Sequence, residues 1–228
     1  MAPTRAMSEP LAFGYWSDPL CVWALVAQPK LDRVLAEAGD RLRVDYRVVP
    51  VFGSVPWRFA AGPWSKEGVE GRVRATRRIA VEGGRTDVSG ECWRKAMPQT
   101  SWAPAAAIKA VFALPDGRGA VEGPRYQRAL RERFFVAEQD VGHRRVQLEL
   151  AEELGLDRGA IEARLDDGSA LAAVWEDHAE KERLRIQGSP TYVFDGGRAM
   201  LYGNFDERIL RSTLDELLRG RAPGGSQC

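Results

Sequence analysis

Residues 11–24 read LAFGYWSDPLCVWA. The first six are apolar and rich in aromatic side chains, which predicts a buried strand, and the Ser-Asp-Pro that follows predicts a turn. Asp18 can cap a helix and Pro19 suits a first helical turn, so we expect a helix over residues 20–38. This stretch therefore predicts a strand and a helix joined by a short turn, with Cys21 at the start of the helix.

The chain after this helix changes its pattern twice. Apolar and charged residues alternate over 42–48, which predicts a second strand and completes a βαβ unit. Residues 50–66 combine prolines and glycines with aromatic residues, and we expect an irregular aromatic loop there. The part that follows is helical by its apolar spacing. We expect helices at 66–82, 101–113, 123–137, 143–154, 157–166 and 168–184.

The last part returns to a strand pattern. Residues 190–194 predict a strand, Asp195-Gly196-Gly197 a hairpin turn, and 198–202 the return strand. Apolar residues at helical spacing predict a last helix over 206–218. The order is then βαβ, a block of helices, and ββα. If the two end pieces pair in one sheet, the helical block is an insertion into a single α/β sheet.

This order suggests three parts. The N-terminal and C-terminal sheet parts cover 11–65 and 186–220, and the inserted helical domain covers 66–185. Residues 1–10 and the Gly/Pro/Ser-rich residues 221–228 are expected to be flexible tails.

The composition excludes several function classes. The chain has 228 residues, with 33 Lys and Arg against 32 Asp and Glu. Because these charges balance, we do not expect a positive electrostatic field over the surface that would attract nucleic acid. Three cysteines and two histidines give neither a disulfide scaffold nor a metal-ligand pattern. No apolar run approaches the ~18 residues of a membrane span, and the N-terminus has no signal-peptide pattern. We expect a cytoplasmic protein with its cysteines reduced and no metal.

Cys21 is the first candidate for chemistry. The unpaired amides of a first helical turn and the positive end of the helix dipole favour thiolate over thiol. A cysteine in that position has a lowered pKa and is nucleophilic near neutral pH. The alternative is a small buried apolar residue, which is the usual role of a free cysteine. Cys21 alone leaves both interpretations open.

Ser189-Pro190-Thr191 is the second candidate. A proline at the first residue of a strand, after a small residue, is compatible with a cis bond. A cis proline there would expose the backbone of Ser189 to an extended peptide or a thiol ligand. The alternative is an ordinary trans proline, which base rates favour.

Together these two segments resemble the DsbA family of thioredoxin-like proteins. The resemblance rests on D-P-L-C-x-W at 18–23, on Q-G-S-P-T-Y-V-F at 187–194 and on Y-G-N at 202–204, and it extends over residues 11–218. It implies an α/β thioredoxin-like fold with a helical insertion. The family includes dithiol–disulfide oxidoreductases and isomerases, the kappa-class glutathione transferases and the 2-hydroxychromene-2-carboxylate isomerases.

The chain departs from the dithiol members of this family at one position. They have C-x-x-C where this chain has Cys21-Val22-Trp23-Ala24, so Ala24 replaces the resolving cysteine. A monothiol can still attack a disulfide and hold a mixed disulfide, which an external thiol such as glutathione then releases. Cys92 and Cys228 are distant alternatives. We expect packing for Cys92 and a stray terminal thiol for Cys228.

The resemblance also implies binding residues. Ser189 and Pro190 would position the substrate backbone with support from Thr191, and Trp23 would shape an apolar lip. Asn204 and Asp206 fall near the position where the kappa-like branch holds glutathione. Their alternative role is to cap the last helix.

Two further groups have a structural and a functional interpretation. Four tryptophans of the loop and the early helical part could line an apolar cleft, but the core of the insertion is the better interpretation. They are Trp57, Trp64, Trp93 and Trp102. A basic run at 72–78 could meet an anionic ligand, but a solvated helix face is favoured. It contains Arg72, Arg74, Arg77 and Arg78.

The leading hypothesis is a DsbA-like thiol–disulfide oxidoreductase that acts as a monothiol through Cys21, with glutathione as co-substrate and no permanently bound cofactor. The second is a glutathione-dependent isomerase or transferase of small aromatic or electrophilic molecules. The third is a non-catalytic binding module that kept the fold. Expected partners are a thiol or disulfide substrate or glutathione, with no nucleic acid and no membrane. A homodimer is left open.

Overall fold

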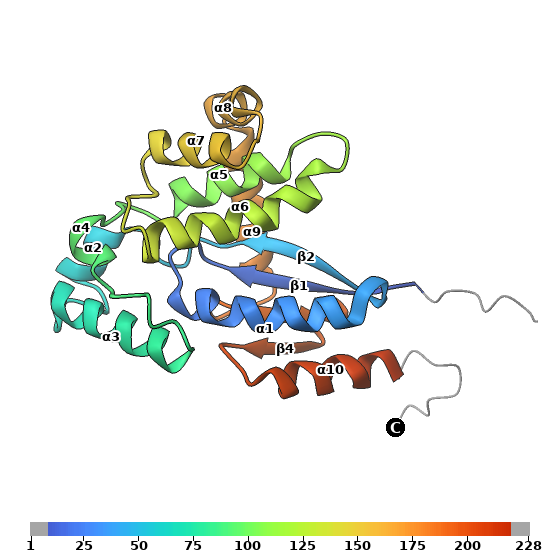
Figure 1. Ribbon diagram of the computed structural model, residues 1–228. Helices are drawn as coiled ribbons and strands as arrows, with labels where there is room; N and C mark the ends of the chain where they lie inside the picture. The colour runs from blue at the N-terminus through green and yellow to red at the C-terminus, as the bar shows by residue number, and fades with distance from the viewer. Residues whose placement is uncertain (1–8, 220–228) are drawn as a thin grey trace, which may run out of the picture.

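One mixed sheet joins the strands near the N-terminus to those near the C-terminus (Figure 1). The structure is a computed structural model, and it describes residues 9–219. The strands β1 (Leu11–Ser17), β2 (Leu42–Val48), β3 (Thr191–Phe194) and β4 (Ala199–Tyr202) lie in the order β2-β1-β3-β4. β1 pairs in parallel with β2 and antiparallel with β3, and β4 pairs antiparallel with β3. The predicted βαβ and ββα pieces therefore share one sheet, which is the thioredoxin-like arrangement.

The helices between β2 and β3 form the block that the sequence places there. Helix α1 (Val22–Ala38) connects β1 to β2, and α10 (Glu207–Arg219) follows β4. The block itself contains α2 (Val55–Ala60), α3 (Gly68–Glu82), α4 (Cys92–Lys95), α5 (Trp102–Phe112), α6 (Arg118–Phe135), α7 (Arg144–Glu153), α8 (Arg158–Asp166) and α9 (Ser169–Arg183). The boundaries of a separate helical domain stay a prediction. Of the expected tails at 1–10 and 221–228, residues 1–8 and 221–228 lie outside the described residues.

One face of the sheet is covered by α1 and α10 (Figure 1). Alternate residues of β1 point to this face, and Leu11, Phe13 and Tyr15 are buried in one cluster with apolar residues of both helices. Leu31 of α1 and Leu214 of α10 belong to that cluster. The pleat of β1 thus gives the sheet an apolar side on which the helix after the Cys21 turn is fixed.

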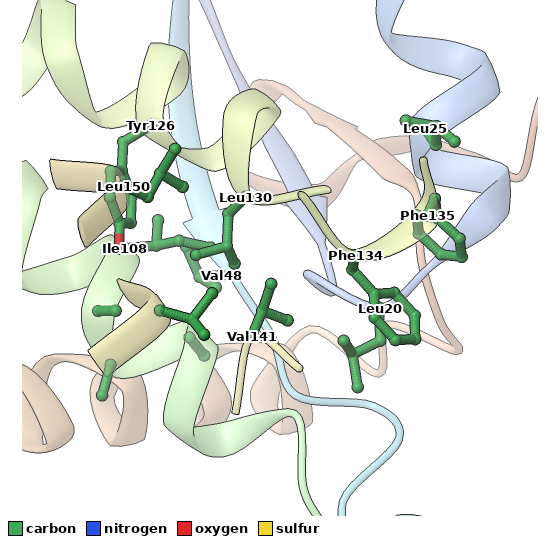
Figure 2. Packing of buried hydrophobic residues seen from close by; sticks show 14 of the residues in the cluster. Leu20, Leu25, Val48, Ile108, Tyr126, Leu130, Phe134, Phe135, Val141 and Leu150 are labelled. Carbon is green, nitrogen blue, oxygen red and sulfur yellow. The ribbon is translucent and has the colours of Figure 1, made fainter. Parts of the chain in front are cut away.

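A second, larger core joins the N-terminal end of α1 to the helical block (Figure 2). Leu20 and Leu25 share this core with Phe134 and Phe135 of α6, and all four side chains are buried. The turn that bears Cys21 therefore rests on the helical block as well as on the sheet.

Two short helices differ from the expected irregular structure. α2 lies inside the predicted aromatic loop, because Ser54 accepts a hydrogen bond from the Trp57 amide at 3.3 Å and Pro56 suits the first turn. α4 is a single turn that the sequence pattern did not indicate. α6 also begins earlier than residue 123, and Pro124 lies inside it rather than at its start.

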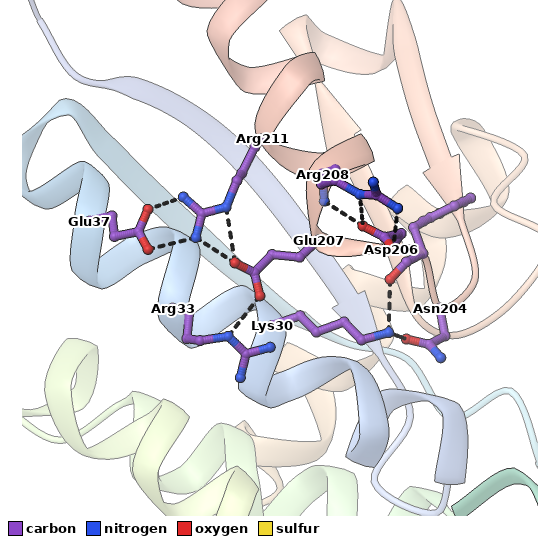
Figure 3. Close-up of polar contacts among 9 residues, drawn as sticks. Lys30, Arg33, Glu37, Asn204, Asp206, Glu207, Arg208 and Arg211 are labelled. Carbon is purple, nitrogen blue, oxygen red and sulfur yellow. Dashed lines mark hydrogen bonds and ion pairs between the residues drawn. The ribbon is translucent and has the colours of Figure 1, made fainter. Parts of the chain in front are cut away.

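Ion pairs between α1 and α10 lie at the surface (Figure 3). Arg211 donates to both Glu37 and Glu207, and Arg33 donates to Glu207 at 2.7 Å. Because these side chains are partly exposed, solvent and salt screen their attraction. We expect Arg211→Gln to lower the free energy of unfolding by less than about 1 kcal/mol.

Urea denaturation at low and at high salt measures this loss, and it should shrink at high salt. Arg208→Gln is the control, since Arg208 is exposed and its ion pair with Asp206 does not connect α10 to α1. A loss several times larger for Arg211→Gln would show that the pairing holds α10 in place.

Candidate functional site

Cys21 lies at the N-cap of α1 and is almost fully buried, with 4% of its surface exposed. Its thiol donates a hydrogen bond to the Ser189 carbonyl at 3.1 Å. The Ser189–Pro190 peptide bond is cis, against the base rate. The structure therefore brings together the two segments that the sequence singled out, from opposite ends of the chain.

The pKa of the Cys21 thiol differs from the expected one. Burial raises the pKa of the Cys21 thiol, and hydrogen bonds with Ser189 and with the Ala24 amide oppose that rise without cancelling it. Buried Asp18 raises this pKa further, and Arg131 lowers it. The expectation of a lowered pKa is thus wrong for this conformation. The free energy lost when a thiolate is removed from water is larger than the stabilisation that the first-turn amides give it.

Asp18 is a site residue that the sequence suggested only as a helix cap. Its side chain is fully buried and accepts hydrogen bonds from the Leu20 amide at 2.7 Å and the Phe52 amide at 3.1 Å. Its own amide donates to Ser189 Oγ at 2.8 Å. Asp18 therefore ties the Cys21 turn to the loop after β2 and to the segment before β3.

The burial of Asp18 makes stability depend on pH. Burial raises the pKa of Asp18 from 3.8 to about 6, although the two amide hydrogen bonds lower it. Between these values the folded chain binds more protons than the unfolded chain, so stability is greatest below pH 4 for this group and falls as pH rises through 6. The full effect is on the order of 3 kcal/mol.

We expect Asp18→Asn to flatten that fall, because the amide does not ionise. Urea denaturation at several pH values from 4 to 7 measures the slope. Asp40→Asn, at an exposed position, should keep the slope of the unchanged chain. An unaltered slope in Asp18→Asn would assign the pH dependence to other groups.

Helix α6 supports the same turn from the other side. Arg131 is 1% exposed and donates through Nη2 to Ser17 Oγ at 2.7 Å and to the Asp18 carbonyl at 3.4 Å. Gln127 donates to Ser17 Oγ at 2.8 Å. No local pattern in the sequence linked these α6 residues to the turn, because their partners lie more than a hundred positions away.

The predicted substrate-binding residues occupy different surroundings. Ser189 and Thr191 are buried, and the Thr191 hydroxyl donates to the Gly188 carbonyl at 2.8 Å, which shapes the segment around Pro190. Trp23 is 39% exposed, so its ring is open to solvent two residues after Cys21. Their roles in binding stay predictions.

Asn204 and Asp206 already have partners within the chain (Figure 3). Asn204 Oδ1 accepts from Lys30 of α1 at 2.8 Å, and Asp206 accepts from the Arg208 amide at 2.9 Å, just before α10. Asp206 thus serves as a cap for the last helix. Their assignment to glutathione stays a prediction.

The tryptophans of the loop and the helical block differ in how deeply they are buried. Trp93 is fully buried and its Nε1 donates to Thr76 at 2.9 Å, and Trp64 packs edge-on against it with a centroid distance of 5.3 Å. Trp57 is 57% exposed, so the interpretation as core is wrong for this residue. The interpretation as core is confirmed for Trp93.

The other cysteines lie away from this arrangement. Cys92 is fully buried beside Trp93, and burial raises the pKa of its thiol to about 12. This is the surrounding of a packing residue. Cys228 lies outside the described residues. Within residues 9–219 there is no group of three or more His, Cys, Asp or Glu side chains that could hold a metal ion. No helix of that range is long and apolar enough to cross a membrane.

The comparisons with known proteins agree with the family resemblance of the sequence. The family model of the DSBA-like thioredoxin domain matches residues 14–215. The cytosolic disulfide reductase DsbM from Pseudomonas aeruginosa is 27% identical, with a TM-score of 0.67 over 92% of this chain and 99% of that one. A 2-hydroxychromene-2-carboxylate isomerase is 18% identical, with a TM-score of 0.66 over 95% and 100%. The ClpXP adapter protein SpxH of Halalkalibacterium halodurans is 24% identical over 92% of this chain and 68% of its own length.

Proposed function

Because the chain belongs to the family of DSBA-like thioredoxin domains, we propose that it is a thiol–disulfide oxidoreductase that works as a monothiol through Cys21. The observation that carries this proposal is the hydrogen bond from Cys21 Sγ to the Ser189 carbonyl, next to the cis Pro190. A substrate sulfur that reaches Cys21 would meet the Ser189 carbonyl at the same point. The similarity to a disulfide reductase supports the reaction class.

The proposed reaction needs no second cysteine. Cys21 loses its proton to solvent, and the thiolate attacks one sulfur of a disulfide, so that the old S–S bond breaks and one substrate thiolate leaves. A glutathione thiolate then attacks the mixed disulfide, forms a disulfide with the bound half and releases Cys21. The sum exchanges one thiol of the disulfide for glutathione, with no electrons left over.

The raised pKa of Cys21 gives this proposal a pH dependence. The thiolate is the reactive form, so the rate of alkylation should rise with pH, with a midpoint above that of an ordinary cysteine thiol. Iodoacetamide labelling from pH 6 to 11, in a Cys92→Ser/Cys228→Ser background, measures it. A midpoint below about 8.5 would show that solution structure exposes the thiol and lowers its pKa.

Glutathione separates the proposed function from its rival in that same background. Oxidised glutathione should form a covalent adduct of Cys21, seen as an added mass that reduction removes. Protection from alkylation by reduced glutathione, with no adduct from the oxidised form, would overturn disulfide exchange.

A specific observation favours the second hypothesis, a glutathione-dependent isomerase or transferase. Cys21 remains a thiol that donates a hydrogen bond, and such a donor could hold a glutathione thiolate without forming a bond to it. The third hypothesis, a binding module without chemistry, agrees with the relative named as an adapter protein. Both predict that Cys21 forms no mixed disulfide.

We also propose a cytosolic location and thiol or disulfide partners. The supporting observation is that the similar Pseudomonas reductase carries the name cytosolic. Glutathione is proposed as co-substrate only.

A further inference from the structure

Two arginines lie against the aromatic rings that follow β2. The guanidinium carbon of Arg58 is 5.1 Å from the Phe52 ring centroid and 5.2 Å from that of Trp64. The guanidinium carbon of Arg72 is 4.4 Å from the Trp64 centroid and 5.5 Å from that of Phe52. All four side chains are half-buried, so the two cations share a partly exposed aromatic support.

Neither cation has an acidic partner within the described part of the chain. Arg58 donates to the backbone carbonyls of Phe52 and Val51, and buried Arg72 Nε has no hydrogen-bond partner. Arg94, nearby in the fold, is bonded to Glu70 and Glu91 instead. Burial lowers the pKa of both Arg58 and Arg72, the latter to about 10, and the charge of Arg58 adds to the effect on Arg72. Two partly desolvated positive charges side by side are costly unless an anion completes them.

This pair belongs to the same part of the fold as the proposed nucleophile. Arg72 is on α3, which packs against α1, and it is within electrostatic reach of both Cys21 and Asp18. Arg58 binds the carbonyl of Phe52, whose amide donates to the Asp18 carboxylate. The support of the cations and the turn of Cys21 are thus parts of one hydrogen-bonded arrangement.

We propose that Arg72, assisted by Arg58, recognises a carboxylate on the substrate and so selects acidic thiols and disulfides for reaction at Cys21. This inference rests on the proposed function. A guanidinium that is held against aromatic rings can still donate from its terminal N–H groups to a carboxylate in two-point contact. The sequence pattern favoured a solvated helix face for this basic run. Arg74, Arg77 and Arg78 are exposed as that interpretation requires, whereas Arg72 turns inward.

The test compares two disulfides that differ in charge. In the Cys92→Ser/Cys228→Ser background, Cys21 is reacted with 5,5′-dithiobis(2-nitrobenzoate), which has two carboxylates, and with 4,4′-dithiodipyridine, which has none. Each forms a mixed disulfide with Cys21 and breaks the S–S bond of the reagent. The first releases 5-thio-2-nitrobenzoate as a thiolate, with the thiol proton going to buffer, and the second releases 4-thiopyridone, whose ring nitrogen takes the proton. The measured quantity is the rate with 5,5′-dithiobis(2-nitrobenzoate) divided by the rate with 4,4′-dithiodipyridine. This ratio cancels any effect that a substitution has on the thiol itself.

We expect Arg72→Gln to lower this ratio about tenfold, the value of a lost charge-assisted hydrogen bond. Arg72→Lys should keep part of it, and the ratio of the unchanged chain should fall with rising salt. Arg74→Gln, on an exposed part of the same helix, is the matched control and should leave the ratio unchanged. An unchanged ratio in Arg72→Gln, or equal losses with both reagents, would overturn the inference and leave Arg72 a packing residue.

A binding measurement separates this inference from the proposed function. The Cys21→Ser chain is titrated by calorimetry with S-methylglutathione, which cannot exchange disulfides, and with its diethyl ester, which lacks the carboxylates. The anion site is supported if the acid binds and if two affinities are about tenfold lower: that of the ester for the Cys21→Ser chain, and that of the acid for the chain that also carries Arg72→Gln. If Cys21 reacts with neither disulfide, the proposed function fails, and this titration alone decides the site; equal binding of acid and ester, or none, overturns it.

Discussion

Replacing Cys21 with serine is expected to abolish mixed-disulfide formation, a loss of about a thousandfold or more in rate. A hydroxyl is a far weaker nucleophile and forms no S–S bond, and the remaining described thiol, Cys92, is buried with a raised pKa. The experiment, in a Cys228→Ser background that leaves Cys92 as the only other thiol, follows glutathione adducts by mass after exposure to oxidised glutathione. The volume near Ser189 changes little, so the fold should persist.

The control for this variant is Cys92→Ser, which should keep the adduct. An adduct that persists in Cys21→Ser would place the reactive sulfur elsewhere and remove Cys21 from the mechanism. If Cys21→Ser instead retains glutathione binding and turns over small electrophiles, the non-covalent alternative replaces the disulfide-exchange proposal, since serine can donate the same hydrogen bond.

Replacing Trp93 with alanine is expected to cost about 3–5 kcal/mol of the free energy of unfolding. The ring is fully buried and packs edge-on against Phe134 at a centroid distance of 5.0 Å, and its Nε1 is bonded to Thr76. Truncation leaves a cavity beneath Trp64 and an unpaired Thr76 hydroxyl. Both effects act on the core that supports the α3 side of the site.

Urea denaturation followed by circular dichroism measures this loss. Trp57→Ala is the matched control, because Trp57 is the same residue type on the neighbouring segment but is 57% exposed. Trp57→Ala should lower the free energy of unfolding by less than a third of the loss expected for Trp93→Ala. A loss below about 1 kcal/mol for Trp93→Ala would mean that the helices of the block close around the missing ring.

The sequence predicted those elements whose signals are local. The strand and turn at 11–19 and the hairpin around Asp195 are confirmed because alternation, proline and glycine act on their immediate neighbours. The family resemblance added the pairing of the two ends. α2 escaped prediction because a six-residue helix leaves little periodicity beside its prolines and aromatics.

The properties of the site depend on distant neighbours, and the sequence did not supply them. Asp18 has partners at Phe52 and Ser189, so its burial and its raised pKa follow only from the folded chain. The same holds for Cys21, whose pKa depends on how deeply the turn is buried. Arg72 differs from Arg74 only by which side of α3 it occupies.

The pairing of β1 with β3 also has a consequence for biosynthesis. When Ser17 leaves the ribosome, the strand that completes its sheet at Thr191 has not been made. At about 5–20 residues per second, the wait is roughly ten to thirty seconds. During it, β1 lacks one neighbour and the Ser189 carbonyl that binds Cys21 does not exist, so the nascent thiol is open to solvent and oxidants. High contact order thus makes the newly made chain more vulnerable than the finished one.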